Sequence, residues 1–66
     1  MNLTVNGEPV QVEPGLTLAE LMAARFPVPT GIAVAVDATV VPRGDWATVT
    51  LAPGQAIEVL TAVQGG

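Results

Sequence analysis

The end of the chain carries the residues whose chemistry is most specific. The sequence finishes with Val63, Gln64, Gly65 and Gly66, so a terminal carboxylate would follow two residues without side chains. Glycine has no Cβ, and backbone of this kind can pass through a channel too narrow for other residues. Fully extended, the four residues reach about 14 Å at roughly 3.3–3.6 Å per residue. Either the Gly66 carboxylate is a reactive group that enters another protein's active site, or the two glycines are a frayed end.

The remaining composition argues against a self-contained enzyme. The 66 residues include no cysteine, histidine or tyrosine, and the sequence also lacks lysine and serine. General acid–base catalysis near neutral pH relies on histidine, and covalent catalysis relies on serine, cysteine or lysine. Carboxylates are present, but no pair has a spacing that suggests a shared site. The lack of cysteine also excludes disulfides and thiolate metal sites, and we expect no metal site in the chain.

The charge balance indicates the kind of partner that the chain can bind. The net charge is −4, which repels phosphate backbones and suits a basic protein surface, although the same acidity also serves solubility. No apolar run approaches the roughly 18 residues of a membrane span, and "MNLTVNGEPV" lacks the regions of a signal peptide. We therefore expect a cytoplasmic protein that binds neither nucleic acid nor membrane.

A β-hairpin is predicted at the start of the chain. Residues 3–12 alternate around Asn6 and Gly7, two residues that tolerate positive φ in a tight turn. The alternation places these apolar side chains on one face: Leu3, Val5, Val10 and Val12. Pro9 has no N–H to donate, which makes the second strand an edge strand.

A helix is predicted after the hairpin. Thr17 can cap its N-terminus while Glu20 reaches back, in the pattern of a capping box. The i, i+3, i+4 and i+7 positions of one stripe are Leu18, Leu21, Met22 and Arg25, so the stripe is largely apolar. Pro27 and Pro29 end the helix.

Two short strands follow the helix. Ile32 to Val36 is continuously apolar, a pattern typical of a strand that is buried on both faces. Val40 and Val41 form a partner strand that stops at Pro42.

The last predicted strand covers residues 56–63, with Ile57 and Val59 pointing inward. Between the strands, residues 43–51 are irregular, with 48–51 extended. The order of elements predicts an α+β domain in which one main helix packs on one face of a mixed sheet of four to five strands.

Four stretches of the sequence resemble a known family. They are "VNGE", "TLAELM", "AVAVD" followed by "VVPRGDWA", and "IEVLTAVQGG", and together they span nearly the whole chain. The order of elements is that of the ubiquitin-like β-grasp, and the combination resembles the ThiS family, the sulfur carriers of thiamine biosynthesis. Gly-Gly alone is a weak motif, whereas the "VVPR…W" segment together with "VQGG" is considerably more specific. The resemblance implies one β-grasp domain over residues 1–66, with 63–66 as a flexible C-terminal tail.

The resemblance also implies a carrier mechanism. An adenylating enzyme similar to ThiF would use ATP and Mg²⁺ to convert the Gly66 carboxylate into an acyl-adenylate. Sulfur from a persulfide-bearing enzyme would displace AMP and leave a thiocarboxylate. A thiazole synthase similar to ThiG would then accept the sulfur. In this scheme the chain binds no cofactor and is a substrate rather than an enzyme.

Two alternatives differ from this interpretation. The chain could carry sulfur in another pathway, as the small subunit of molybdopterin synthase, in tRNA thiolation, or as a ubiquitin-like conjugated protein. Carriers of the molybdopterin type are typically longer and have proline before Gly-Gly, which "LTAVQGG" lacks. The second alternative is a plain β-grasp interaction module with incidental glycines.

The residues before the tail form a candidate partner surface. Leu60, Ala62 and Val63 are apolar and lead into the tail, although core packing is a competing interpretation for Leu60. Arg43 and Trp46 are further candidates. Small domains rarely hide a whole tryptophan, so we expect partial burial of Trp46 and a role in supporting the core.

Overall fold

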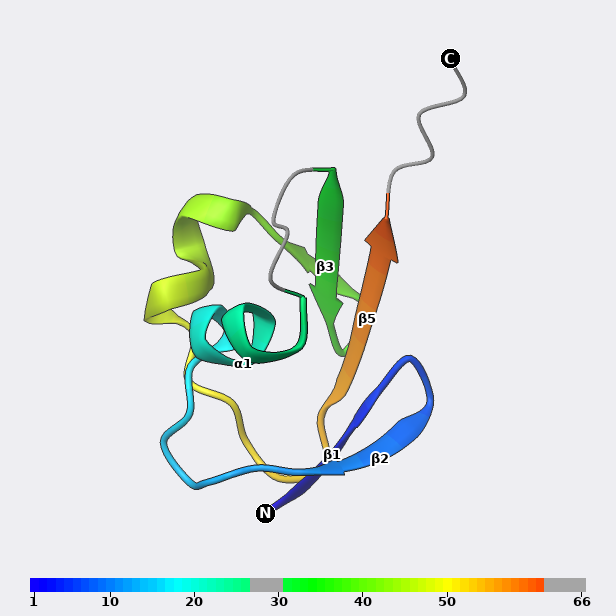
Figure 1. Cartoon of the computed structure of the whole chain (residues 1–66), viewed down its shortest axis with the longest axis vertical. Coiled ribbons are helices and arrows are strands. Elements are labelled where there is room, and N and C mark those ends of the chain that lie inside the picture. The colour runs from blue at the N-terminus through cyan, green and yellow to red at the C-terminus, as the bar shows by residue number, and fades with distance from the viewer. Residues whose placement is uncertain (27–30, 62–66) are drawn as a thin grey trace.

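The computed structural model describes residues 1–26 and 31–61. They form a five-stranded sheet with one α-helix across one of its faces (Figure 1). In chain order the elements are β1 (Asn2–Val5), β2 (Glu8–Gln11), α1 (Leu18–Arg25), β3 (Ile32–Val36), β4 (Thr39–Val41), the 3₁₀ helix η1 (Arg43–Thr48) and β5 (Ala56–Thr61). The strand order is β2-β1-β5-β3-β4. β1 and β5 are parallel and the other neighbours antiparallel. The predicted mixed sheet with one main helix is confirmed.

The first hairpin has the predicted turn. Asn6 and Gly7 have φ angles of 51° and 82°. Met1 and Val12 exchange two backbone hydrogen bonds, of 2.8 and 2.9 Å. Along an antiparallel ladder, residue pairs that exchange such bonds alternate with pairs that do not. By this alternation Thr4 and Pro9 are a pair that does not, so the backbone nitrogen of Pro9 faces outward from the edge of the sheet. The proline therefore removes no hydrogen bond from the ladder.

Helix α1 begins with the predicted capping box. The Glu20 N–H donates to Thr17 Oγ1 at 3.1 Å, and the Thr17 N–H donates to Glu20 Oε1 at 2.9 Å. The buried residues of the helix are Leu18, Leu21 and Met22. Arg25, at the last position of the stripe, is exposed and ends the helix. Pro27 and Pro29, which were expected to end it, lie outside the described residues.

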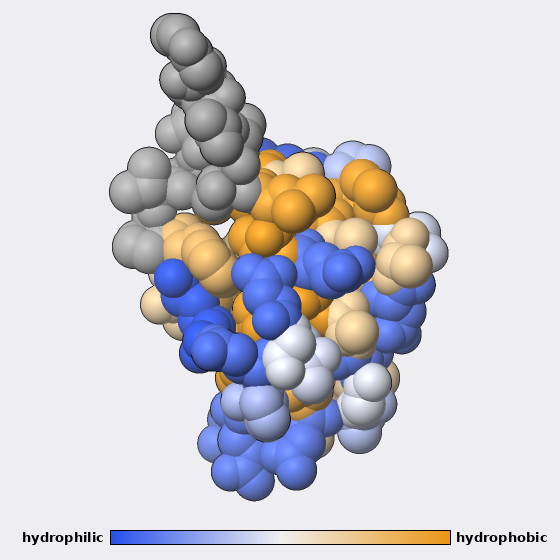
Figure 2. Space-filling view, turned by 90° about the vertical axis from the view of Figure 1, so that its right-hand side faces the viewer, coloured by the Kyte–Doolittle hydropathy of each residue, from blue (hydrophilic) through white to orange (hydrophobic). Residues whose placement is uncertain are grey.

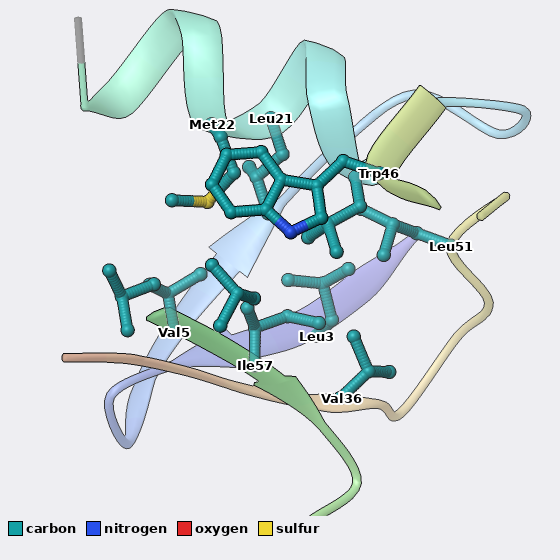
Figure 3. Close-up of a cluster of buried hydrophobic side chains, with 11 residues drawn as sticks. Leu3, Val5, Leu21, Met22, Val36, Trp46, Leu51 and Ile57 are labelled. Carbon is teal, nitrogen blue, oxygen red and sulfur yellow. The ribbon is translucent and has the colours of Figure 1, made fainter. Parts of the chain in front are cut away.

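The hydrophobic core lies between α1, η1 and the sheet (Figure 3). It consists of Leu3, Val5, Leu18, Leu21, Met22, Val34, Val36, Trp46, Leu51, Ile57 and Val59. The inward positions predicted for β1 and β5 are confirmed. Val10 and Val12 are half-buried and pack against the core from the edge of the sheet.

The expectation that β3 is buried on both faces is wrong. Val34 and Val36 are buried, whereas Ala33 is exposed and Ala35 is half-buried. β3 pairs antiparallel with both of its neighbours, and an antiparallel sheet can leave one face to solvent. Helix α1 covers only the other face.

The segment after β4 is more regular than expected. η1 occupies Arg43–Thr48, so the start of the 48–51 stretch is helical rather than extended. Thr50 then forms an isolated bridge with Thr17, which ties this segment to the start of α1. Trp46 is the buried residue of η1 and provides the apolar anchor that holds this short helix against the core.

Candidate functional site

The strand that leads toward the C-terminus lies in the middle of the sheet. β5 is flanked by β1 and β3, and its end lies at the opposite end of the molecule from the N-terminus (Figure 1). The residues that follow Thr61 are Ala62, Val63, Gln64, Gly65 and Gly66. They lie outside the described residues, and so do the predictions made for them, including a flexible tail.

Asn6 holds β5 beyond the point where its pairing with β1 ends. The parallel pairing stops at Val5 and Ile57. The Asn6 N–H donates to the Ile57 carbonyl at 2.8 Å, and the Asn6 side-chain Oδ1 accepts the Val59 N–H at 2.8 Å. Sequence analysis identified Asn6 as a turn residue and missed this second contact. The side chain extends the ladder by one bond toward the C-terminal residues.

A second turn holds the other end of β5. Asp37 Oδ1 accepts the Ala56 N–H at 2.9 Å, and the Asp37 N–H donates to the Ala56 carbonyl at 2.8 Å. Asp37 and Ala38 have φ angles of 49° and 68°, which is the left-handed region that a two-residue hairpin turn requires. β5 is thus fixed at its start by Asp37 and near its end by Asn6.

The face of the sheet away from α1 carries exposed apolar side chains. Among the described residues, the exposed large hydrophobic side chains are Val40, at 69%, and Leu60, at 70%. Figure 2 looks onto the side of the molecule away from α1 and shows apolar side chains gathered there, with hydrophilic ones beside them. Leu60 is therefore not packed in the core, and its assignment to the candidate partner surface stays open.

Trp46 corrects one of the sequence predictions. Its side chain is only 6% exposed, and its indole N–H donates to the Val41 carbonyl at 3.0 Å. The predicted role in supporting the core is confirmed, the expected partial burial is wrong, and a partner contact by Trp46 stays a prediction. An indole fits inside this small domain because η1 turns Trp46 inward and Val41 satisfies its only polar group.

Arg43 lies apart from the exposed face of the sheet. Its guanidinium is 5.6 Å from the centre of the Trp46 ring, and Arg43 is the first residue of η1, which packs beside α1 (Figure 1). Leu60 is on the opposite face of the sheet. The structure therefore does not bring the predicted surface residues together: Leu60 belongs to one face, and Arg43 and Trp46 belong to the other.

The described residues offer little chemistry of their own. Within residues 1–26 and 31–61, no group of three or more histidine, cysteine, aspartate or glutamate side chains could hold a metal ion. In the same part of the chain, no helix is long and apolar enough to cross a membrane. What the described structure provides is a firmly held central strand and an exposed apolar face beside it.

Comparison with known proteins identifies the family. A model of the ThiS family matches residues 3–66. The chain belongs to the ThiS family. The crystal structure of the thiamine biosynthesis protein ThiS from Geobacter metallireducens is 33% identical with a TM-score of 0.86, over 100% of both chains. The solution structure of a thiamine biosynthesis protein from the same organism is also 33% identical with a TM-score of 0.79, covering 100% of this chain and 88% of that one. A comparison with curated proteins gave no match.

The ThiS family assignment confirms the resemblance seen in the sequence. It also confirms the ubiquitin-like β-grasp fold, because the similarity to the ThiS crystal structure extends over the entire chain. The match includes the Gly-Gly end, since the family model reaches residue 66.

Proposed function

We propose that this protein is a sulfur carrier of thiamine biosynthesis, with Gly66 as the residue that carries the sulfur. The observation that supports the proposal is the ThiS family match, which extends through the two glycines to residue 66. The composition agrees with a carrier rather than an enzyme, since the chain has no histidine or cysteine, and the residues best suited to acid–base and covalent catalysis are missing.

The first step activates the carboxylate. An adenylating enzyme of the ThiF type supplies ATP and Mg²⁺, and a Gly66 carboxylate oxygen attacks the α-phosphorus. The bond between that phosphorus and pyrophosphate breaks, which leaves an acyl-adenylate. A carboxylate is a poor electrophile, and AMP provides the leaving group that it lacks. The protein contributes its own terminal group to this step and binds no cofactor itself.

The second step introduces sulfur. A persulfide on a donor enzyme attacks the acyl carbon, and the C–O bond to AMP breaks. A second thiol of the donor then reduces the remaining S–S bond, which releases the thiocarboxylate on Gly66 and a disulfide on the donor. A ThiG-like thiazole synthase accepts the sulfur from the thiocarboxylate. We place these exchanges in the cytoplasm, where ATP is available.

The fold is consistent with this delivery because the strand that precedes the C-terminal residues is firmly held. β5 is held at both sides in the sheet, and five residues follow Thr61. Extended inside a partner, five residues reach at most about 18 Å. Gly65 and Gly66 would occupy the narrowest part of a channel, with Val63 and Gln64 behind them. Leu60 and Ala62 would contact the partner at its entrance, and Arg43 stays a candidate contact on the other face.

Intact-mass measurement tests the proposal. The protein is incubated with the purified adenylating enzyme of the same organism, Mg-ATP and a persulfide donor. The mass should rise by the difference between one sulfur and one oxygen atom, and fragmentation should place the sulfur on Gly66. Omitting ATP should prevent the change. The chain has no cysteine that could hold sulfur as a persulfide. Sulfur found on an internal residue would therefore contradict the proposal, and so would an unchanged mass in the complete reaction.

A further inference from the structure

The exposed face of the sheet contains a small hollow. Its volume is about 120 Å³, and it is lined by Ala33, Val34, Ala35, Val40, Glu58 and Leu60. Ala35 lies opposite Val40 on one side and opposite Glu58 on the other. Ala33 lies opposite Leu60. Two alanines therefore form the floor, and longer side chains form the walls, so the hollow has room for one medium-sized aliphatic side chain.

The walls of the hollow are the feature that distinguishes it from an ordinary surface depression. Val40 and Leu60, the large apolar side chains that are exposed in the described part of the chain, are both at its rim. Single exposed apolar residues are common on protein surfaces, but their concentration around one concave site marks an interaction surface. Figure 2 shows apolar side chains gathered on the side of the molecule away from α1.

Glu58 indicates the charge of the partner. The residue is exposed, and no ion pair of its carboxylate is found within residues 1–26 and 31–61. A protein that covers the hollow removes water from this carboxylate, which is unfavourable unless the protein supplies a positive charge. Arginine fits best because its guanidinium can bind a carboxylate through two parallel hydrogen bonds. The net charge of −4 favours the same kind of partner at longer range.

A second copy of this chain does not have that chemistry. A symmetric dimer uses the same patch on both subunits, so pairing through this face would bring the two Glu58 carboxylates toward each other. Strand addition is also disfavoured at the two edges of the sheet. The β2 edge contains Pro9, and β4 has three residues and is followed by Pro42.

We propose that the hollow and Glu58 form a docking site for a protein that inserts one aliphatic side chain between Val40 and Leu60 and pairs an arginine or lysine with Glu58. Glu58 and Leu60 belong to β5, which ends at Thr61, so a partner seated here is close in the chain to the five residues that follow. The inference rests on the proposed function for the identity of that partner, the adenylating enzyme.

Filling the hollow distinguishes binding that depends on the shape of the hollow from binding through general apolar contact. Ala35→Leu occupies the hollow and at the same time adds apolar surface. We expect its Kd for the purified adenylating enzyme, measured by titration calorimetry, to rise about tenfold or more, because the aliphatic side chain of the partner no longer fits. Thr4→Leu is the matched control. Thr4 belongs to β1, is half-buried on the same face of the sheet as Ala35, and lies outside the hollow. Its Kd should stay within about threefold of the parent value.

Reversing the charge tests the ion pair. Glu58→Arg should also raise the Kd about tenfold or more, because it places a cation against the positive group of the partner. Glu13→Arg changes the net charge by the same amount at an exposed position away from the hollow, so any effect on long-range attraction is equal. We expect Glu13→Arg to change the Kd by less than about threefold. Thermal unfolding shows whether each variant is folded, and Ala33→Leu replaces Ala35→Leu if the latter does not fold.

The outcomes separate this inference from the proposed function. Folded Ala35→Leu and Glu58→Arg proteins that bind as the parent does would overturn the docking site while adenylation of the parent upholds the carrier function. If the parent binds through Glu58 but is not adenylated, the docking site stands and the carrier function fails. A parent that does not bind contradicts both. A dimer in sedimentation analysis that Ala35→Leu dissociates would show that a second copy occupies the hollow instead.

Discussion

Asn6 has two roles that depend on different parts of the chain. Its position before Gly7 predicts a tight turn, and both residues have positive φ angles. Its side chain also accepts the Val59 N–H, although the two residues are 53 positions apart. Turn chemistry and the Thr17–Glu20 capping box depend on close neighbours in the sequence, so both were predictable. The contact with Val59 depends on which strand lies beside the turn, and no local pattern reveals it.

Replacing Asn6 with glycine isolates the second role. Glycine keeps the positive φ but removes the acceptor of the Val59 N–H, and leaving a partly buried donor unsatisfied costs about 1–3 kcal/mol. For a domain of this size, the melting temperature should fall by roughly 4 °C or more. Asn6→Asp is the control, because it keeps an acceptor and should melt close to the parent. Identical melting of Asn6→Gly and the parent would show that the bond adds no stability.

At the scale of elements, the sequence predicts the strands and the helix better than it predicts what covers them. β3 is apolar throughout, yet only alternate residues face the core: Val34 and Val36 are buried there, and Ile32 packs against it half-buried. Its outward positions are Ala33 and Ala35, which are apolar but small enough to be exposed at little cost. The strand therefore lacks the alternation of apolar and polar residues that would indicate an exposed face. η1 was missed because a single 3₁₀ segment has no periodic signal. Its buried Trp46 became evident only from the packing.

Trp46→Phe tests whether this residue supports the core or contacts a partner. The substitution keeps an aromatic ring but removes the hydrogen bond to the Val41 carbonyl and leaves that part of the core less filled. We expect the free energy of unfolding to fall by about 1–3 kcal/mol in denaturant titrations. ATP–pyrophosphate exchange by the adenylating enzyme, measured well below the melting temperature, should be unchanged because the side chain is 6% exposed.

Arg43→Ala is the matched control for Trp46→Phe, because it changes the exposed side of the same ring. A cation over an aromatic face at an exposed site contributes about 0.5–1 kcal/mol, so the loss of stability should be smaller. If Trp46→Phe were as stable as the parent and slowed the exchange reaction, the side chain would be a partner contact and not a core anchor.

At the scale of the whole molecule, the proposed function assigns different tasks to the packed part of the protein and to its C-terminal residues. Within the described part of the chain, the core residues lie between Leu3 and Val59, whereas the family match continues to residue 66. The order of elements was predictable, because each strand and the helix α1 have a local sequence pattern. The Gly-Gly motif is read directly from the sequence. The hollow was not, because it arises from the register that sets Ala35 between Val40 and Glu58. Sequence analysis identified only Leu60 from this surface.

Deleting Gly66 separates the two parts experimentally. Terminal residues beyond the last strand contribute little to stability, so the melting temperature should match that of the parent. Loss of one residue moves the terminal carboxylate by roughly 3.3–3.6 Å. A displacement of even about 1 Å in a reacting group can cost about 10²-fold in rate. ATP–pyrophosphate exchange by the adenylating enzyme should therefore fall at least about 10²-fold.

Two further variants distinguish length from bulk at the C-terminus. One residue added after Gly66 shifts the carboxylate by the same amount in the other direction and should be as harmful as the deletion. Gly65→Ala keeps the length and adds only a Cβ, so its effect should be smaller and should report how closely the partner encloses the backbone. All three variants should melt like the parent. Exchange at the parent's rate by the deletion variant would mean that the carboxylate is not the activated group and that the two glycines are a frayed end.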